Sequence, residues 1–154
     1  MLFRAIVAFF AVPGLVALAL PLAIARGIRT SLHPGIPAIA ALILGLLLLL
    51  WCVREFYVSG QGTLAPWWPP QHLVMTGPYH YCRNPMYIGV SLMLVGWALL
   101  YRCLPLLLYA GSVAAAFHLR VVLAEEPAAS RIFGEAWQHY ARTTPRWVRW
   151  RIVR

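Results

Sequence analysis

Residues 36–53, IPAIAALILGLLLLLWCV, form an apolar run that contains no charged side chain. A run of about 20 apolar residues is long enough to cross the ~30 Å hydrocarbon core of a bilayer as an α-helix. Because lipid offers no hydrogen-bond partners, a chain that crosses it must satisfy its backbone groups within helices. This stretch therefore predicts an all-α membrane protein.

The composition of the whole chain supports the same fold class. Its 154 residues are 62% hydrophobic and 11% charged, and the mean hydropathy of +0.72 is far from that of soluble domains. The length supports one membrane domain over residues 1–154. We expect a polytopic bundle of about four transmembrane helices with a cytoplasmic C-terminal helix.

Other apolar runs supply the remaining spans. The predicted transmembrane segments are residues 2–25, 36–53, 85–100 and 104–123. The first run also has the basic start of a signal peptide, but its apolar part is longer than the ~7–15 residues of a signal-peptide h-region. We therefore expect a retained helix that is bent near Pro13 or Pro21. Arg102 and Pro105 predict a tight reversal between the last two spans.

Two segments are expected to lie outside the hydrocarbon core. Residues 54–84 contain helix-breaking glycines and prolines and two tryptophans, which is typical of a structured loop at the membrane surface. Residues 125–154 begin as an amphipathic helical segment. They end in a tail that alternates arginine with apolar residues, which we expect to contact anionic lipid.

The charge balance predicts the orientation. A formal charge of +9 comes from 13 arginines, with no lysine, against four glutamates. In a membrane protein such an excess reflects the positive-inside bias and anionic headgroups rather than nucleic acid. With four spans, all arginines except Arg26, Arg29 and Arg102 share one side with both termini. We expect that side to be the cytoplasm, and the lysine-free composition favours a bacterial inner membrane.

Polar groups gather just before the third span, in GPYHYCRNPMY, residues 77–87. Asn84 and Pro85 have a structural explanation, since asparagine is a good N-cap and proline is favoured at the first helical position. That explanation does not cover Tyr79 and Arg83 beside them. A helix N-terminus also attracts anions, so we expect a carboxylate or phosphate to bind here.

A second group of ionisable residues lies where the fourth helix is expected to end. Glu125 and Glu126 are either solvated acids that open the next helix or part of a site, because a helix C-terminus disfavours carboxylates. His118 precedes Glu125 by seven residues and is expected on the same face. Arg120 either contacts a ligand or extends to the headgroups. The three cysteines have no C-x-x-C spacing and predict neither a disulfide framework nor a metal site.

Taken together, these residues resemble the membrane methyltransferases typified by isoprenylcysteine carboxyl methyltransferase, a superfamily that includes phospholipid N-methyltransferases. The shared residues, within about 60–147, are Leu73-Val74, Gly77-Pro78-Tyr79, Arg83 to Gly89, Glu125-Glu126, Phe133-Gly134, Tyr140 and Pro145-Arg146-Trp147. The resemblance implies a methyltransferase that binds S-adenosylmethionine on the cytoplasmic side and takes a lipid-like substrate sideways from the bilayer.

The resemblance also implies particular site residues. The expected cofactor-binding residues are His72, Leu73, Val74, Tyr79, Asn84, Pro85, Met86, Tyr87 and Glu125. A helix N-terminus or arginine suits the cofactor carboxylate, a glutamate suits its ribose hydroxyls, and apolar walls suit its adenine. Arg83, Arg120 and Glu125 are the expected catalytic residues: an arginine would orient an anionic headgroup, and Glu125 with Tyr79 would fix the cofactor. No metal is expected.

The sequence departs from the family pattern at several positions. Asn84 stands where the family most often has histidine, Trp137 where it usually has tyrosine, and Ala129 where it usually has leucine. Val121 stands where members that act on prenylcysteine have arginine. Sequence leaves the methyl acceptor open among a prenyl-thioether carboxylate, a phospholipid amine and a small thiol. An NADPH-dependent membrane reductase of the sterol-reductase type and a non-catalytic helical scaffold are the alternatives.

Overall fold

The computed structural model describes residues 10–60 and 72–148, with side chains from Pro13 onward. All regular elements within these ranges are helical: η1 (Phe10–Ala19), α2 (Leu20–Ile28), α3 (Ile36–Val58), η2 (Gly77–His80), α4 (Pro85–Tyr101), α5 (Leu104–Arg120), η3 (Val121–Glu125) and α6 (Glu126–Thr143). Elements η1 and η3 are π-helical, and η2 is a 3₁₀ turn. The predicted all-α bundle is confirmed.

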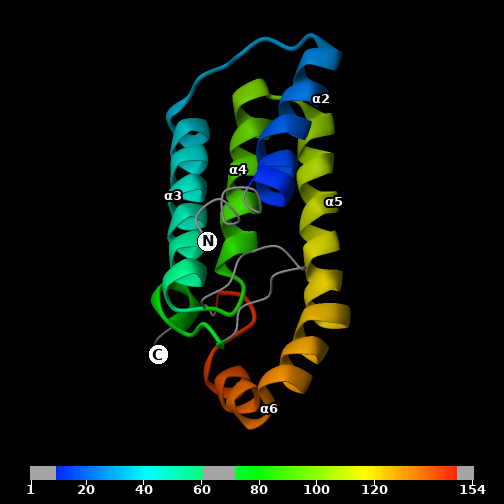
Figure 1. Ribbon diagram of the computed structural model, residues 1–154. Coiled ribbons are helices and arrows are strands. Elements are labelled where there is room, and N and C mark those ends of the chain that lie inside the picture. Colours follow the sequence, from blue (N-terminus) through cyan, green and yellow to red (C-terminus); the bar gives the residue numbers. More distant parts are fainter. Residues whose placement is uncertain (1–9, 61–71, 149–154) are drawn as a thin grey trace, which may run out of the picture.

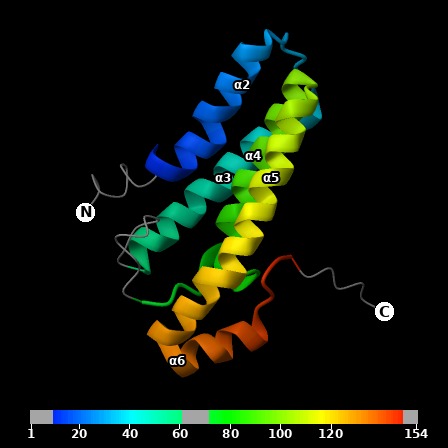
Figure 2. The same ribbon diagram turned by 90° about the vertical axis from the view of Figure 1, so that its right-hand side faces the viewer.

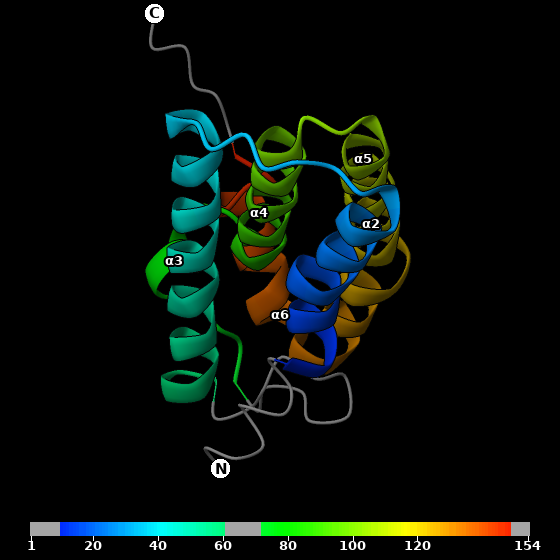
Figure 3. The ribbon, with the colours of Figure 1, turned by 90° about the horizontal axis from the view of Figure 1, so that it is seen from above.

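The long helices pack side by side, with α4 between α3 and α5 and with α2 next to α5 (Figures 1 and 3). Residues 29–35 and the reversal between α4 and α5 lie at one end of the bundle (Figure 1). Residues 72–84, the start of α4 and all of α6 lie at the other, which we call the α6 end. Figure 2 shows α6 running across this end, below α5.

The described helices have the length and surface of membrane segments. Ile36–Val58 and Leu104–Thr143 are long and apolar enough to cross a bilayer, and Pro13–Ile28 and Pro85–Tyr101 are shorter apolar helices. Large side chains such as Leu47 are exposed on the outside of the bundle, which suits contact with lipid. Parts of three predicted segments, residues 2–9, 61–71 and 149–154, lie outside the described residues.

Glycines bring α3 and α4 into the most extensive helix contact of the bundle. A Cβ atom added to Gly45 would lie 2.6 Å from the carbonyl oxygen of Gly89, and one added to Gly96 would lie 2.7 Å from Cγ of Leu42. Neither position has room for a side chain. Where lipid surrounds the helices, small residues at the contact let backbones approach and gain van der Waals attraction. This contact aligns the start of α4 with the end of α3.

Local sequence accounts for the helix ends. Pro85 is the first residue of α4, as predicted, and η1 gives way to α2 immediately before Pro21. Helix α4 ends at Tyr101, and the next residue, Arg102, adopts a left-handed conformation (φ 45°) and donates its backbone N–H to the carbonyl of Ala98. Only Cys103 then separates it from the start of α5. The chain therefore reverses where the sequence predicts it.

We expect Gly45→Ala to destabilise the bundle, because the new methyl group would collide with backbone atoms of α4. Overpacking of this kind costs about 1–3 kcal/mol. Gly111→Ala is the matched control, since nothing lies within 4 Å of a Cβ atom added there, and removing glycine from a helix stabilises it by roughly 0.5–1 kcal/mol. Thermal unfolding in detergent measures both variants. Equal melting temperatures would contradict the close α3–α4 packing.

Candidate active site

A π turn joins α5 to α6 and sets the direction of the two adjacent glutamates. In η3 the backbone N–H of Glu126 donates to the carbonyl of Val121, five residues earlier. The expected helix end at this point is wrong, because the helical backbone continues from α5 through η3 into α6. The wider π turn changes the register of the residues that follow, and such turns are frequent at functional sites. Glu125 and Glu126 consequently meet two different sets of partners.

Glu125 is bound to α4 and to α5 through one carboxylate oxygen. The Tyr87 hydroxyl donates to Oε1, and Nε of Arg120 donates to the same atom at 2.7 Å. The Tyr87 ring stacks on Phe117 with the centroids 4.3 Å apart. The Glu125 side chain is 37% exposed, and none of the described residues is hydrogen-bonded to its Oε2. Oε1 thus carries both bonds that Glu125 makes with these residues.

Glu126 is the centre of a charged cluster that we call the Glu126 cluster: Arg83, Glu126, Trp137 and Arg146. Nε and Nη2 of Arg146 each donate to the carboxylate at 2.7 Å. Nη1 of Arg83 lies 3.0 Å from Oε1, and the Arg83 guanidinium carbon is 5.5 Å from the Trp137 ring centroid. The buried Nε of Arg83 has no hydrogen-bond partner among the described residues. The expected catalytic Arg83 is thus held in an ion pair, away from Glu125.

The chain after α6 lies against the 77–87 motif. The Asn84 side-chain amide donates to the carbonyl oxygen of Arg146 at 3.0 Å, and the Arg83 backbone N–H donates to Pro145 at 2.9 Å. Asn84 stands at the N-cap position of α4, as predicted, but its side chain makes no capping bond. The Tyr140 hydroxyl donates to the carbonyl oxygen of Tyr79 at 2.6 Å.

The segment before the motif forms a small apolar cluster at the end of α3. Val74 and Tyr79 are buried with Cys52, and the Phe56 ring meets Tyr79 edge-on at 5.3 Å. Burial raises the pKa of the Tyr79 hydroxyl well above its usual range, so the phenol keeps its proton. His72, at the start of this segment, is exposed. A buried phenol that keeps its proton is unsuited to accept one.

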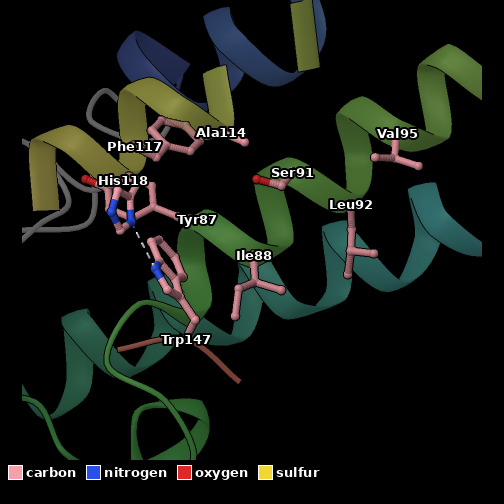
Figure 4. Close-up of a pocket in the computed structure, with 9 residues that line it drawn as sticks. All are labelled: Tyr87, Ile88, Ser91, Leu92, Val95, Ala114, Phe117, His118 and Trp147. Atoms are coloured by element: carbon pink, nitrogen blue, oxygen red, sulfur yellow. Dashed lines mark hydrogen bonds between the residues drawn. The ribbon is translucent and has the colours of Figure 1, made fainter. Parts of the chain in front are cut away.

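A groove of about 420 Å³, the α4–α5 groove, lies between α4 and α5 (Figure 4). It is lined by Tyr87, Ile88, Ser91, Leu92, Val95, Ala114, Phe117, His118 and Trp147. Its α6 end is polar, where Nε1 of Trp147 contacts Nδ1 of His118 at 3.3 Å. The rest is almost entirely apolar. Its volume is within the range of small-molecule sites.

Sequence analysis named Tyr87 as a site residue but missed most of the groove. A signal was present, because Tyr87, Ser91 and Val95 follow one another at four-residue spacing and so share one face of α4. His118 was expected to share a face with Glu125. In the structure it lines the groove, whereas Glu125 follows the π turn and bonds Tyr87.

Comparison with known proteins identifies the family. The family model "Phospholipid methyltransferase" (PEMT) matches residues 34–136. The chain belongs to this phospholipid methyltransferase family. The match runs from the connection before α3 into α6, and so includes both the 77–87 motif and the glutamate pair. The resemblance drawn from the motifs is confirmed at the level of this family of integral membrane methyltransferases, which generally use S-adenosylmethionine.

A curated relative of this chain is the nickel-cobalt-cadmium resistance protein NccN of Alcaligenes xylosoxydans xylosoxydans. The two are 32% identical over 96 residues, which is 62% of this chain and 40% of NccN. The chain thus spans well under two thirds of the relative's length. No solved structure matches the chain. Within residues 10–60 and 72–148, no group of three or more histidine, cysteine or glutamate side chains is placed to hold a metal ion.

Glu126→Gln should loosen α6 from the 77–87 motif. The amide cannot balance the charges of Arg83 and Arg146, and hydrogen bonds to charged groups contribute about 1.5–3 kcal/mol each, less where they are partly exposed as here. We expect a lower melting temperature in detergent and faster tryptic cleavage after Arg131, which is exposed on α6.

Glu135→Gln is the matched control, because Glu135 is exposed on the same helix and forms no ion pair with any residue between 10–60 or 72–148. Its cleavage rate should equal that of the wild type. If Glu126→Gln also behaved as the wild type, the cluster would have no part in holding α6.

Proposed function

We propose that this protein transfers the methyl group of S-adenosylmethionine to a nucleophilic oxygen, nitrogen or sulfur of a lipid-like molecule, as isoprenylcysteine carboxyl methyltransferase does. One observation carries the proposal: Tyr87 lines the apolar α4–α5 groove and also donates its hydroxyl proton to Glu125. The groove suits an apolar tail, and Glu125 suits a cofactor hydroxyl. Tyr87 therefore contacts both the proposed acceptor groove and the proposed cofactor residue.

The residues at the α6 end fit the chemistry of S-adenosylmethionine. Glu125 offers a partly exposed carboxylate to ribose hydroxyls, and the guanidinium charge of Arg83 suits a carboxylate. Phe117, Tyr87 and Trp147 provide aromatic surface. We therefore retain the whole expected set as the proposed cofactor-binding residues: His72, Leu73, Val74, Tyr79, Asn84, Pro85, Met86, Tyr87 and Glu125.

When bound, the sulfonium group of S-adenosylmethionine supplies an activated methyl group. The protein then has to orient the acceptor and exclude water, and a proton acceptor is secondary. Arg120 balances the charge of Glu125 and is about half exposed. We propose it as the contact for an anionic headgroup. Arg83 would take that role only by leaving Glu126, so we propose that it acts on the cofactor side.

The distribution of arginines supports an orientation for this membrane protein. Three arginines, Arg26, Arg29 and Arg102, lie at or beside the connections opposite α6, and the other described arginines, Arg54, Arg83, Arg120, Arg131, Arg142 and Arg146, lie toward the α6 end. By the positive-inside rule, we propose that the α6 end faces the cytoplasm of a bacterial inner membrane. A single membrane domain then presents its proposed cofactor site to the S-adenosylmethionine of the cytoplasm.

We expect Glu125→Gln to bind S-adenosylmethionine about tenfold more weakly than the wild type, because the amide loses the charge that strengthens hydrogen bonds from ribose hydroxyls. Isothermal titration calorimetry in detergent measures the affinity, and Glu135→Gln is the surface control. Unchanged affinity in Glu125→Gln would remove Glu125 from the cofactor site. Titration with NADPH in parallel tests the reductase alternative, and binding of neither cofactor would favour a scaffold.

Ala114→Phe should block the acceptor but spare the cofactor, because Ala114 lines the α4–α5 groove. Ala115→Phe is the control: Ala115 is exposed and about 100° further around α5, outside the groove lining. Each protein is incubated with a bacterial lipid extract and methyl-labelled S-adenosylmethionine, and labelled products are identified by mass spectrometry. We expect product formation to fall at least about tenfold in Ala114→Phe only. Equal product from both variants would exclude the groove as the acceptor site.

A further inference from the structure

A buried carboxylate that sequence analysis did not single out joins the end of α3 to the segment before the 77–87 motif. Glu55 is 6% exposed and lies in the last turn of α3. A helix C-terminus disfavours a carboxylate, and burial adds a desolvation cost. The ionised carboxylate of Glu55 is therefore stable at this position only because other groups donate hydrogen bonds to it.

The donors come from α3 and from the loop. Oγ1 of Thr76 donates to Oε2 of Glu55 at 2.7 Å, and Oγ of Ser59 contacts the same oxygen at 3.3 Å. Nη1 of Arg54 donates to Oε1 at 2.9 Å. The Thr76 and Ser59 hydroxyls are themselves 3.0 Å apart. Thr76 lies 21 residues beyond Glu55, so this bond ties α3 to a distant part of the chain.

The backbone beside Thr76 is fitted to Glu55. Gly77 has a positive φ of 58°, and a Cβ atom there would lie 2.8 Å from Cγ of Glu55 and 2.9 Å from Nε1 of Trp51. The next turn starts directly from this point, since the N–H of Tyr79 donates to the carbonyl of Thr76 at 3.2 Å. Glu55 thus determines where η2 begins.

We propose that Glu55 is a positioning residue for the cofactor site, acting through Thr76 and Gly77. This inference rests on the proposed methyltransferase function. Glu55 is bonded on both oxygens by groups of its own chain and so has no need to touch the cofactor. Its effect is to hold Val74 and Tyr79 in the cluster with Cys52, and with them the chain that enters α4.

The test uses Thr76, which is exposed. Thr76→Val keeps the shape and removes the hydroxyl, whereas Thr76→Ser keeps the hydroxyl. We expect Thr76→Val and Glu55→Gln each to weaken S-adenosylmethionine binding by about tenfold. In Thr76→Ser the affinity should stay close to that of the wild type. The effects of the two weakening changes should be less than additive when combined, because both break one bond.

Hydrogen exchange of the cofactor-free protein separates this inference from the proposed function. The amide of Tyr79 should exchange faster in Thr76→Val than in Thr76→Ser, with the melting temperature nearly unchanged. Faster exchange with wild-type affinity would overturn the positioning role, and so would equal exchange and affinity in the two variants. A wild-type protein that binds no S-adenosylmethionine would overturn the proposed function itself, whatever the exchange rates.

Discussion

The ion pairs of the Glu126 carboxylate are the interaction on which the α6 end of the protein depends. It accepts two bonds from Arg146, which follows α6, and faces Arg83, which precedes α4. Bidentate hydrogen bonds from arginine to a carboxylate are stronger and more specific in geometry than single ones. Because both arginines are only partly exposed, loss of the carboxylate would leave like charges close together with little water to screen them. This one side chain therefore holds α6 against the 77–87 motif.

Two neighbouring glutamates can do separate work because adjacent helical residues point about 100° apart. In a regular α-helix, one added or removed residue rotates everything after it by about 100°. Here η3 alters the register between Val121 and Glu126. Glu125 then turns toward Tyr87 at the groove, and Glu126 turns toward Arg83. The structural ion pair and the proposed cofactor contact are adjacent in sequence, yet they use different partners and can be altered one at a time.

Sequence was sufficient for features that depend on local patterns. Apolar runs predicted the helices, and Pro85 and Arg102 marked the ends of α4 because their backbone preferences act within one turn. The use of the Asn84 amide was not predictable in this way, since its partner, the Arg146 carbonyl, is 62 residues away. Glu55 was overlooked for the same reason. A lone glutamate at a helix end has no motif, and its partner Thr76 is identified only when the chain folds back.

The acceptor and the cofactor are coupled through Arg120 in the proposed mechanism. The described lining of the α4–α5 groove contains no arginine. Val121 stands at the position where the resemblance to enzymes that act on prenylcysteine would place an arginine, and it is buried, with 1% of its surface exposed. A carboxylate acceptor would therefore have to meet Arg120, whose Nε is already bonded to Oε1 of Glu125. Tyr87 donates to the same oxygen, so Glu125 would stay bonded to α4 even where Arg120 turned toward the acceptor. An uncharged acceptor would leave the Arg120–Glu125 pair intact, so the salt dependence of methyl transfer distinguishes the two acceptor classes.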